Sequence, residues 1–349
     1  ANFIALNAMP SVSPELTFSV PKDERTIKSL EQYCSLDEND KPIRSLSASS
    51  LRKYIECPLA FYLKYIEKVP EAEEVSDFMD SAVVGTITHD CLKEIYQDYT
   101  FTAQALRQIE SNTAYIEQLV TKYTNIHFNN KTGNQVNEQL TGEPKLVSEF
   151  IKAYIKRVLG YDADLLQNGG TIEVLDVEVE NVTQLPLAGS ERKVNFKYVI
   201  DRLDKLCLPG EDPIIRIIDY KTGKDEVNFK SVDELFQTKN YGDWPHAIMQ
   251  LFTYANCLIN EHPEYKDFKI QPMIYKLKSI SSSGVFHGKD QLTDFRKDKL
   301  NQGFVEKFSN CINEILDPET AFASTSNPKS CTYCNFKEIC KKEAAPTYN

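Results

Sequence analysis

The chain has 349 residues, of which 41% are hydrophobic, enough to bury the core of one large domain. No run approaches the roughly 20 apolar residues of a membrane span, and the first ten residues lack the basic start of a secretory signal. The net charge of −11 argues against a broad nucleic-acid-coating surface, although a groove needs only local positive charge, for which Arg52 is one candidate. These features predict a globular, cytoplasmic protein without membrane association.

The N-terminal part lacks any clear pattern. Residues from Thr17 to Arg44 are polar and without periodicity, and the sequence opens on Ala1 rather than on methionine. We therefore expect residues 1–44 to be a lead or linker cut from a longer polypeptide, and residues 45–349 to form the folded domain.

The first helical signals follow residue 45. Ser47 or Ser49 can cap a helix that runs through Ile55. Cys57 then precedes Pro58, a residue that fits the first turn of a second helix. This arrangement would hold Cys57 at the junction of two helices.

A longer helical block comes next. The acidic stretch Glu71–Asp80 is typical of a loop, Gly85–Tyr99 has the pattern of a helix, and Thr102–Leu159 is helical over most of its length. His89 lies one turn after Gly85. Taken alone, a single histidine on a helix is more often a structural or surface residue than a metal ligand.

The periodicity then changes to that of strands. Thr171–Thr183 alternates apolar and polar residues, and two further apolar runs follow at Val194–Leu206 and Ile214–Lys221. The last run turns at Thr222-Gly223. Three successive strands therefore follow a helical block.

Charged residues at the end of the third strand form the central candidate site. Because side chains alternate along a strand, Asp219 and Lys221 share one face and Tyr220 points to the other. If the second and third strands pair as a hairpin, Asp201 can lie beside Asp219. Mg²⁺ prefers such carboxylates, and a nearby lysine can orient or deprotonate water and neutralise phosphate charge. An isolated Asp-x-Lys is nevertheless more often a solvated salt bridge.

A helix, a strand and another helix complete the pattern. Pro245–Asn260 carries one apolar stripe, with Gln250 and Tyr254 side by side on its flank, from where they could reach into a groove. Phe268–Ile280 is typical of a strand, and Leu292–Leu316 of a helix.

Nine cysteines, an odd number, argue against a disulfide framework in a cytoplasmic chain. Four are expected to be small core residues because their neighbours are apolar: Cys91, Cys207, Cys257 and Cys311. Cys331, Cys334 and Cys340 instead form C-x₂-C-x₅-C, which is metal-ligand spacing.

Taken together, these residues resemble the RecB-type branch of the PD-(D/E)XK nuclease superfamily, and most of all the iron-sulfur nuclease domains of AddB-like helicase-nuclease proteins. The resemblance covers about Ser45 to Lys342, with the motifs in family order: S-x-S-x-L-x-x-Y-x-x-C-P, Gly85-x₃-His89, I-D-R-x-D at Ile200–Asp204, D-Y-K at Asp219–Lys221, Gln250-x₃-Tyr254 and C-x₂-C-x₅-C. One departure is Tyr198, which stands where the family usually has glycine and affects the expected shape of the groove.

The resemblance implies an α/β fold with an αβββαβ core, a mixed central sheet flanked by helices, added N-terminal helices and a C-terminal cysteine tail. It also implies roles for individual residues. Mg²⁺ or Mn²⁺ would be bound by His89, Asp201 and Asp219. Lys221 would be the catalytic lysine, while Gln250 and Tyr254 would support the site and the DNA strand.

The cysteines have an implied role as well. The family pattern places a [4Fe-4S] cluster on Cys57, Cys331, Cys334 and Cys340, and the junction before Pro58 suits Cys57 as the distant fourth ligand. Zn²⁺ is the alternative occupant, since C-x₂-C serves both chemistries. The x₅ gap and the distant fourth cysteine favour iron-sulfur.

The implied function is a metal-dependent deoxyribonuclease, acting as an exonuclease on single-stranded DNA ends in recombination and repair. A helicase module in the same polypeptide or in a partner subunit would supply the ends, because this sequence has no ATP-binding G-x₄-G-K-[ST]. The alternative is a noncatalytic DNA-binding or scaffolding domain. The intact set of Asp201, Asp219 and Lys221 argues against that alternative.

Overall fold

A computed structural model describes residues 18–71, 81–97, 100–237, 244–332 and 334–340. Of the loop expected at Glu71–Asp80, all but Glu71 lies outside the described residues, and a helix begins directly after it at Ser81. None of the described helices combines the length and the apolar character that a membrane crossing needs.

The centre of the molecule is a mixed, curved sheet. Its strands follow the order β3-β4-β5-β6-β8, and β2 pairs with β5. The β6–β8 and β2–β5 pairs are parallel and the others antiparallel. The strands are β2 (Leu46–Ser47), β3 (Thr100–Phe101), β4 (Thr171–Pro186), β5 (Lys193–Cys207), β6 (Ile214–Lys221) and β8 (Lys269–Lys276).

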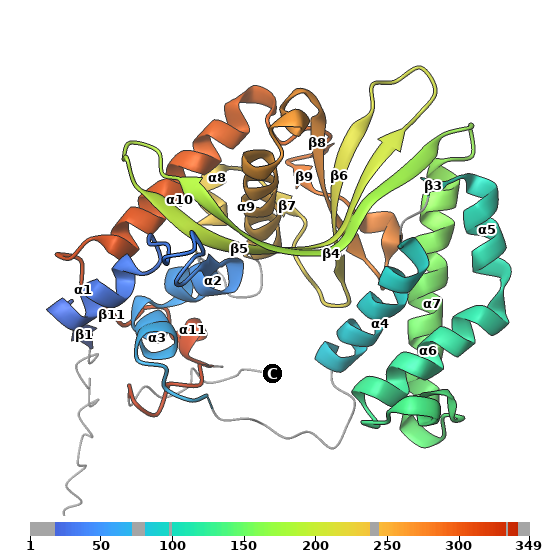
Figure 1. Cartoon of the computed structure of the whole chain (residues 1–349), viewed down its shortest axis with the longest axis horizontal. Helices are drawn as coiled ribbons and strands as arrows, with labels where there is room; N and C mark the ends of the chain where they lie inside the picture. The colour runs from blue at the N-terminus through green and yellow to red at the C-terminus, as the bar shows by residue number, and fades with distance from the viewer. Residues whose placement is uncertain (1–17, 72–80, 98–99, 238–243, 333, 341–349) are drawn as a thin grey trace, which may run out of the picture.

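The expected αβββαβ order is present. Helix α7 precedes β4, β5 and β6, and helix α9 connects β6 to the parallel strand β8. In Figure 1 the long β4–β5 pair bridges two groups of helices. One group is α4 (Ser81–Tyr96), α5 (Ala103–Ser111), α6 (Thr113–His127) and α7 (Gly142–Leu165).

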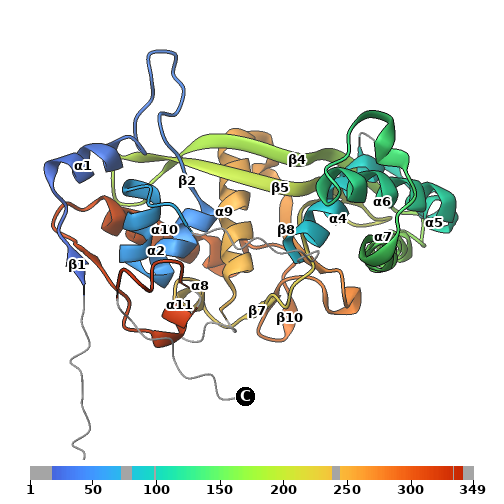
Figure 2. The same cartoon turned by 90° about the horizontal axis from the view of Figure 1, so that it is seen from below.

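The other group combines helices from both ends of the sequence, as Figure 2 also shows. Its members are α1 (Glu24–Glu31), α2 (Ala48–Glu56), α3 (Pro58–Phe61), the π-helix η1 (Tyr62–Ile66), α10 (Leu300–Leu316) and α11 (Pro328–Thr332). Helix α9 (His246–Glu261) follows β6 and precedes β8 in the sequence, and it packs on the sheet against β4, β5 and β8.

Shorter elements connect these parts. A small sheet has the order β10-β9-β7, with β7 (Asn228–Phe229), β9 (Phe286–His287) and β10 (Asp290–Gln291). The remaining short elements are α8 (Val232–Leu235), η2 (Gly133–Asn137), η3 (Pro263–Asp267), η4 (Ile280–Ser282) and η5 (Lys297–Lys299).

Two apolar cores cover opposite faces of the sheet, and strand β6 contributes to both. Ile215 and Ile217 belong to the core with α2 and α9, whereas Ile218 and Tyr220 belong to the core with α4 and α7. This alternation puts Asp219 on the face of Ile217, as the sequence predicts.

Residues 18–44 do not behave as the expected lead or linker. Strand β1 (Ser19–Val20) pairs with β11 (Phe322–Ala323). The side chain of Asp23 caps α1 by accepting from the Thr26 amide at 2.8 Å, and Leu30 and Tyr33 are buried in the core. Packing therefore begins well before residue 45, while residues 1–17 lie outside the described part.

Two helices begin elsewhere than the sequence predicts. Helix α4 begins at Ser81, so that Gly85 lies inside it, and α10 begins at Leu300 rather than at Leu292. The backbone ahead of α10 is held in turns instead, because the Asp294 carboxylate accepts from the Arg296 amide at 3.2 Å and the Ile270 amide at 3.4 Å. Leu292 and Phe295 are buried and three residues apart, which is also a helical spacing, so the sequence pattern predicted a helix that starts too early.

Candidate active site

The β5–β6 hairpin brings the two aspartates together. Its antiparallel register pairs Arg202 with Ile218, which sets Asp201 across from Asp219. The Tyr220 amide donates to Asp201 Oδ2 at 2.7 Å. Both carboxylates are buried, at 9% exposed for Asp201 and 4% for Asp219. The hairpin predicted from the sequence is thus present, and it orients one carboxylate through the other strand's backbone.

Lys221 completes the strand-end group. Its Nζ lies 2.7 Å from Asp219 Oδ2 and 2.9 Å from Oδ1. Burial alone would lower the pKa of Lys221, but the negative charges of Asp219 and Asp201 outweigh burial and raise it. The side chain is therefore an ammonium ion at neutral pH, and this favours charge neutralisation over proton abstraction.

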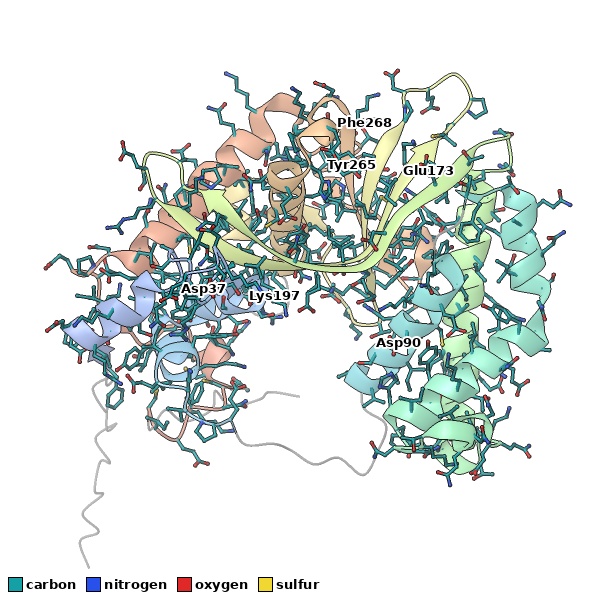
Figure 3. The ribbon with its side chains drawn as sticks, viewed as in Figure 1. Asp37, Asp90, Glu173, Lys197, Tyr265 and Phe268 are labelled. Carbon is teal, nitrogen blue, oxygen red and sulfur yellow. The ribbon has the colours of Figure 1, made fainter. Side chains whose placement is uncertain are left out.

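His89 reaches the same point from α4. Its Nε2 lies 3.1 Å from the Tyr220 carbonyl oxygen, which can only accept a hydrogen bond. In the neutral ring Nε2 then carries the proton, and Nδ1 presents a lone pair. Nδ1 lies 3.5 Å from Asp201 Oδ1 and 3.6 Å from Glu178 Oε1. Figure 3 shows the next residue, Asp90, on the side of the β4–β5 ribbon away from Tyr265 and Phe268.

Glu178 is a site residue that the sequence did not reveal. The pairs Val177–Arg202 and Val179–Ile200 place it opposite Asp201. Its φ is +52°, which is uncommon for a residue other than glycine within a strand. In the alternating pattern of β4, Glu178 is one of several polar residues and has no signal of its own. The register of β4 shifts between Val174 and Asp176. Such a shift cannot be read from the sequence, and it changes the direction in which the side chains after it point.

Helix α9 contributes two side chains to the candidate site, Gln250 and Tyr254. Gln250 Nε2 donates to Asp219 Oδ1 at 3.3 Å. Tyr254 is buried, and its ring centre lies 6.2 Å from that of Tyr198. Burial, helped by the charges of Asp219 and Asp201, raises the pKa of Tyr254. Neither residue lies on a solvated helix face.

Tyr198, the departure from the family pattern, is accommodated in the core. It is 1% exposed, and its hydroxyl donates to the Glu261 carboxylate of α9. The ring thus packs between the sheet and α9, where a glycine would leave space.

The charges of this site suit a cation. Burial raises the pKa of Asp201; the charge of Asp219 adds to this effect and that of His89 opposes it. Burial opposes protonation of His89, yet Asp201 and Glu178 raise its pKa above the usual value. Ligand atoms of His89, Glu178 and Asp201 all lie within 4.8 Å of one another. Oxygen-rich donors with one imidazole fit a hard divalent ion such as Mg²⁺ or Mn²⁺.

A groove of about 1030 Å³ opens beside Lys221. Its walls come from α2, the start of α4, the end of β6 and the start of α9, and they include Arg52, His246 and Gln250. Arg52 Nε donates to Glu56 Oε1 at 2.9 Å. Burial and the positive charge of Arg52 lower the pKa of His246. Arg52 and Lys221 are thus basic residues that line the groove, and Asp225 is an acidic one.

The four cysteines of the second candidate site come together. Cys57, Cys331, Cys334 and Cys340 line one small pocket between the α2–α3 junction and the C-terminal segment. Cys57 ends α2 and begins α3, as the sequence predicts, and its Sγ accepts from the Thr325 amide at 3.4 Å. Residues far apart in the sequence are thus gathered at one point.

Comparisons with known proteins agree with this geometry. A family model for the PD-(D/E)XK nuclease superfamily matches residues 45–341. A subunit of an ATP-dependent helicase/deoxyribonuclease from Clostridioides difficile (strain 630) is 28% identical over 239 residues, covering 65% of this chain and 18% of that protein. The protein of the same name from Clostridium acetobutylicum is 24% identical over 263 residues, covering 71% of this chain and 20% of that protein.

The chain thus spans about a fifth of the length of these curated relatives. Among solved structures, the crystal structure of SSO0001 aligns with 85% of this chain and 96% of its own, at 14% identity and a TM-score of 0.26.

Proposed function

We propose, from the premise that this chain belongs to the PD-(D/E)XK nuclease superfamily, that the site at the end of β6 hydrolyses phosphodiester bonds of DNA with the help of a divalent metal ion. The observation that carries this proposal is the convergence of Asp201, Asp219 and Lys221 at one strand end, next to a groove that Arg52 also lines. A structural salt bridge alone would not need the third carboxylate or the imidazole beside it.

Three side chains would hold the ion: His89, Asp201 and Asp219. Glu178 is a fourth candidate, because its carboxylate lies within 4.8 Å of ligand atoms of His89 and Asp201. A bound Mg²⁺ or Mn²⁺ would polarise the phosphate and activate the attacking water. The backbone of Tyr220 would keep Asp201 and His89 in place, because its amide donates to Asp201 and its carbonyl oxygen lies beside His89 Nε2.

The remaining residues act on the substrate and on the ligands. The Lys221 ammonium would neutralise charge on the phosphate oxygens and orient the attacking water. Gln250 would hold the Asp219 carboxylate through its amide. Tyr254 would support that arrangement by packing against Tyr198.

The names of the relatives support a proposal for the substrate and the partner. Their shared name joins a helicase to a deoxyribonuclease, and unwinding produces single strands. We infer that residues 45–349 form the nuclease domain, with residues 18–44 packed against it, and that it acts as an exonuclease on single-stranded ends in recombination and repair. A helicase module, in the same polypeptide or in a partner subunit, would deliver those ends to the groove.

The cysteine pocket would hold a [4Fe-4S] cluster on Cys57, Cys331, Cys334 and Cys340. The support for this proposal is that all four cysteines line the same small pocket. Zn²⁺ remains the alternative occupant, because four cysteines suit both chemistries.

A cleavage assay tests the nuclease proposal. Single-stranded and duplex DNA, labelled at the 5′ or the 3′ end, are incubated with the protein in Mg²⁺, Mn²⁺ or EDTA. We expect metal-dependent cleavage that starts at ends of single strands. Asp219→Ala and Lys221→Ala should each lower the rate by a factor of about 10² or more.

Lys205→Ala provides a matched control, because Lys205 lies on the adjacent strand and forms its ion pair with Glu173 away from the site. It should cleave like the wild type. Cleavage by Asp219→Ala at the wild-type rate would refute the assignment. Metal-dependent DNA binding without any cleavage by the wild type would instead establish a noncatalytic DNA-binding domain.

A further inference from the structure

Four charged side chains form a buried network on the sheet face opposite Asp219. Arg202 Nη2 lies 2.8 Å from Asp162 Oδ2, and Arg202 Nε lies 3.0 Å from Asp204 Oδ2. Arg216 donates to the two oxygens of Asp204 at 2.6 and 2.7 Å. None of the four side chains is more than 1% exposed. Two positive and two negative charges thus compensate each other in the buried interior.

Two tyrosines attach further elements to this network. Tyr96 of α4 donates its hydroxyl to Asp162 Oδ2 at 2.7 Å, and Tyr275 of β8 donates to Asp162 Oδ1, also at 2.7 Å. The Arg202 guanidinium lies 4.0 Å from the centre of the Tyr96 ring. The single Asp162 carboxylate of α7 therefore binds one helix and one strand in the same way.

The strands that carry the proposed metal ligands also carry network residues. On β5, Arg202 is the neighbour of Asp201 and points to the other face. On β6, Arg216 precedes Asp219 by three residues. The network therefore fixes the backbone that presents each aspartate.

The same holds for α4. Tyr96 follows His89 by seven residues, which is about two turns and puts both on the same side of the helix. His89 faces Asp201 across the gap between α4 and the sheet, while Tyr96 is anchored to Asp162 deeper in the molecule. By contrast, α7 and β8, which supply Asp162 and Tyr275, carry none of the proposed ligands.

We propose that the bond between Tyr96 and Asp162 is the part of this network that positions the metal site, and that Tyr96 is the positioning residue that sets how closely His89 approaches Asp201. Burying four charges costs free energy, and such groups are kept where they fix one arrangement. The inference rests on the proposed function, because it assumes that His89 and Asp201 bind the same ion.

Two variants test the proposal as a matched pair. Tyr96→Phe and Tyr275→Phe each remove one hydroxyl and one 2.7 Å bond to the same carboxylate. Tyr275 also accepts from Arg216 at 3.2 Å, so its loss disturbs more of the network. A merely structural role predicts that Tyr275→Phe is at least as harmful. If Tyr96 positions His89, Tyr96→Phe should instead weaken metal binding more than Tyr275→Phe does.

The measurement is Mn²⁺ binding to the full chain by titration calorimetry at one pH. We expect Tyr96→Phe to weaken binding by about tenfold or more, as loss of a group that orients a ligand does, and Tyr275→Phe to weaken it by less than about twofold. Equal Mn²⁺ affinity in Tyr96→Phe and the wild type, or equal weakening in both variants, would overturn the inference. An Asp219→Ala variant that binds Mn²⁺ like the wild type would instead overturn the proposed function.

Hydrogen exchange of the wild type offers a second measurement that needs no variant. We expect Mn²⁺ to slow exchange around Asp162 of α7, because the network couples that helix to the ligands. Slower exchange that is confined to α4, β5 and β6 would contradict the proposal. For a variant that is less stable than the wild type without metal, metal binding is compared through the rise in Tm that Mn²⁺ causes, measured for each protein from its own metal-free Tm.

Discussion

Glu178 holds a backbone conformation that costs on the order of 1 kcal/mol for a residue with a side chain, since its φ is +52°. Its carboxylate meanwhile faces His89 and Asp201. Strain that persists beside the proposed ligands supports a role for this position in the site and not in the stability of the strand.

This leads to a prediction for Glu178→Asn. Asparagine tolerates positive φ better than glutamate does, so the free energy of unfolding should stay equal or rise by up to about 1 kcal/mol. Mn²⁺ affinity should fall, because a charged ligand is lost. Thermal unfolding and titration calorimetry measure the two effects. The control Glu180→Asn changes an exposed glutamate two residues away that pairs with Lys197, and it should leave Mn²⁺ affinity unaltered.

Arg52 provides a prediction for the groove. Its Nε is bound to Glu56, and the side chain lines the same groove as Lys221. If DNA phosphates lie there, Arg52→Gln should weaken single-stranded DNA binding in EDTA and reduce the slope of log affinity against log salt by about 1.

The matched control is Arg107→Gln, which removes an arginine of α5 that pairs with Glu110 and with Asp164 of α7. It should bind DNA like the wild type. Fluorescence anisotropy over a series of salt concentrations distinguishes the two variants, and an unchanged salt slope for Arg52→Gln would exclude a phosphate contact.

Which site residues the sequence could predict depends on how local their signal is. Asp219 and Lys221 follow from alternation along one strand, and Asp201 from pairing of two neighbouring strands. Glu178 required the register shift in β4, which depends on packing. The roles suggested for Gln250 and Tyr254 needed the family pattern, because a position on the flank of a helix does not say which groups it meets.

At the scale of elements, the network around Asp162 predicts how stability changes with pH. Burial opposes the charge of Asp162, but Arg202 and Arg216 outweigh burial and hold the pKa of that carboxyl below its usual value. A group whose pKa is lower in the folded state stabilises the fold above its unfolded pKa of about 3.9. That contribution is lost as the pH falls through the folded pKa.

We therefore predict that Asp162→Asn lowers the free energy of unfolding by about 3 to 5 kcal/mol at pH 7, since it leaves two buried arginines with one carboxylate. The difference from the wild type should shrink as the pH falls below about 4. Urea unfolding at several pH values gives this comparison. A difference that stays constant down to about pH 2, below the usual range of the carboxyl, would argue that folding does not lower the pKa of Asp162.

Most elements of this fold could be predicted from periodicity alone. The strands β4, β5 and β6 and helix α9 have long, consistent patterns and lie within a few residues of their expected bounds. Starts of helices were harder. Ahead of α10, the Asp294 carboxylate accepts a hydrogen bond from the Ile270 amide, and Ile270 is distant in sequence.

At the scale of the whole molecule, the cysteine pocket joins the N-terminal helices to the C-terminal segment. Anaerobically purified protein should be brown if the pocket holds the proposed cluster. Cys57→Ser should bleach this colour and lower Tm, because a link that closes a very long loop is lost. Cys257→Ser, in a buried cysteine of α9, should keep the colour. Colourless anaerobic protein with one bound zinc would establish the zinc alternative.

Residues 18–44 show why the extent of the folded part was hard to predict. Leu30 and Tyr33 have a helical spacing, but the stretch around them is short and polar, and its burial depends on elements from other parts of the chain. Lys22 is buried as well, and its Nζ donates to the carbonyl oxygens of Glu314 and Asp317 near the end of α10. Such contacts depend on partners almost 300 residues away.

The pairing of β1 with β11 also determines when this part of the fold can be completed during synthesis. Ser19 pairs with Ala323, so the first strand has no partner until the segment that holds β11 has left the ribosome. At about 5 to 20 residues per second, the strand waits on the order of 15 to 60 s. Throughout that interval the edge of β1 and the apolar residues of α1 are available to chaperones or to other nascent chains. Slow translation of the stretch between α1 and β11 should therefore increase aggregation more than slow translation of the residues ahead of β1.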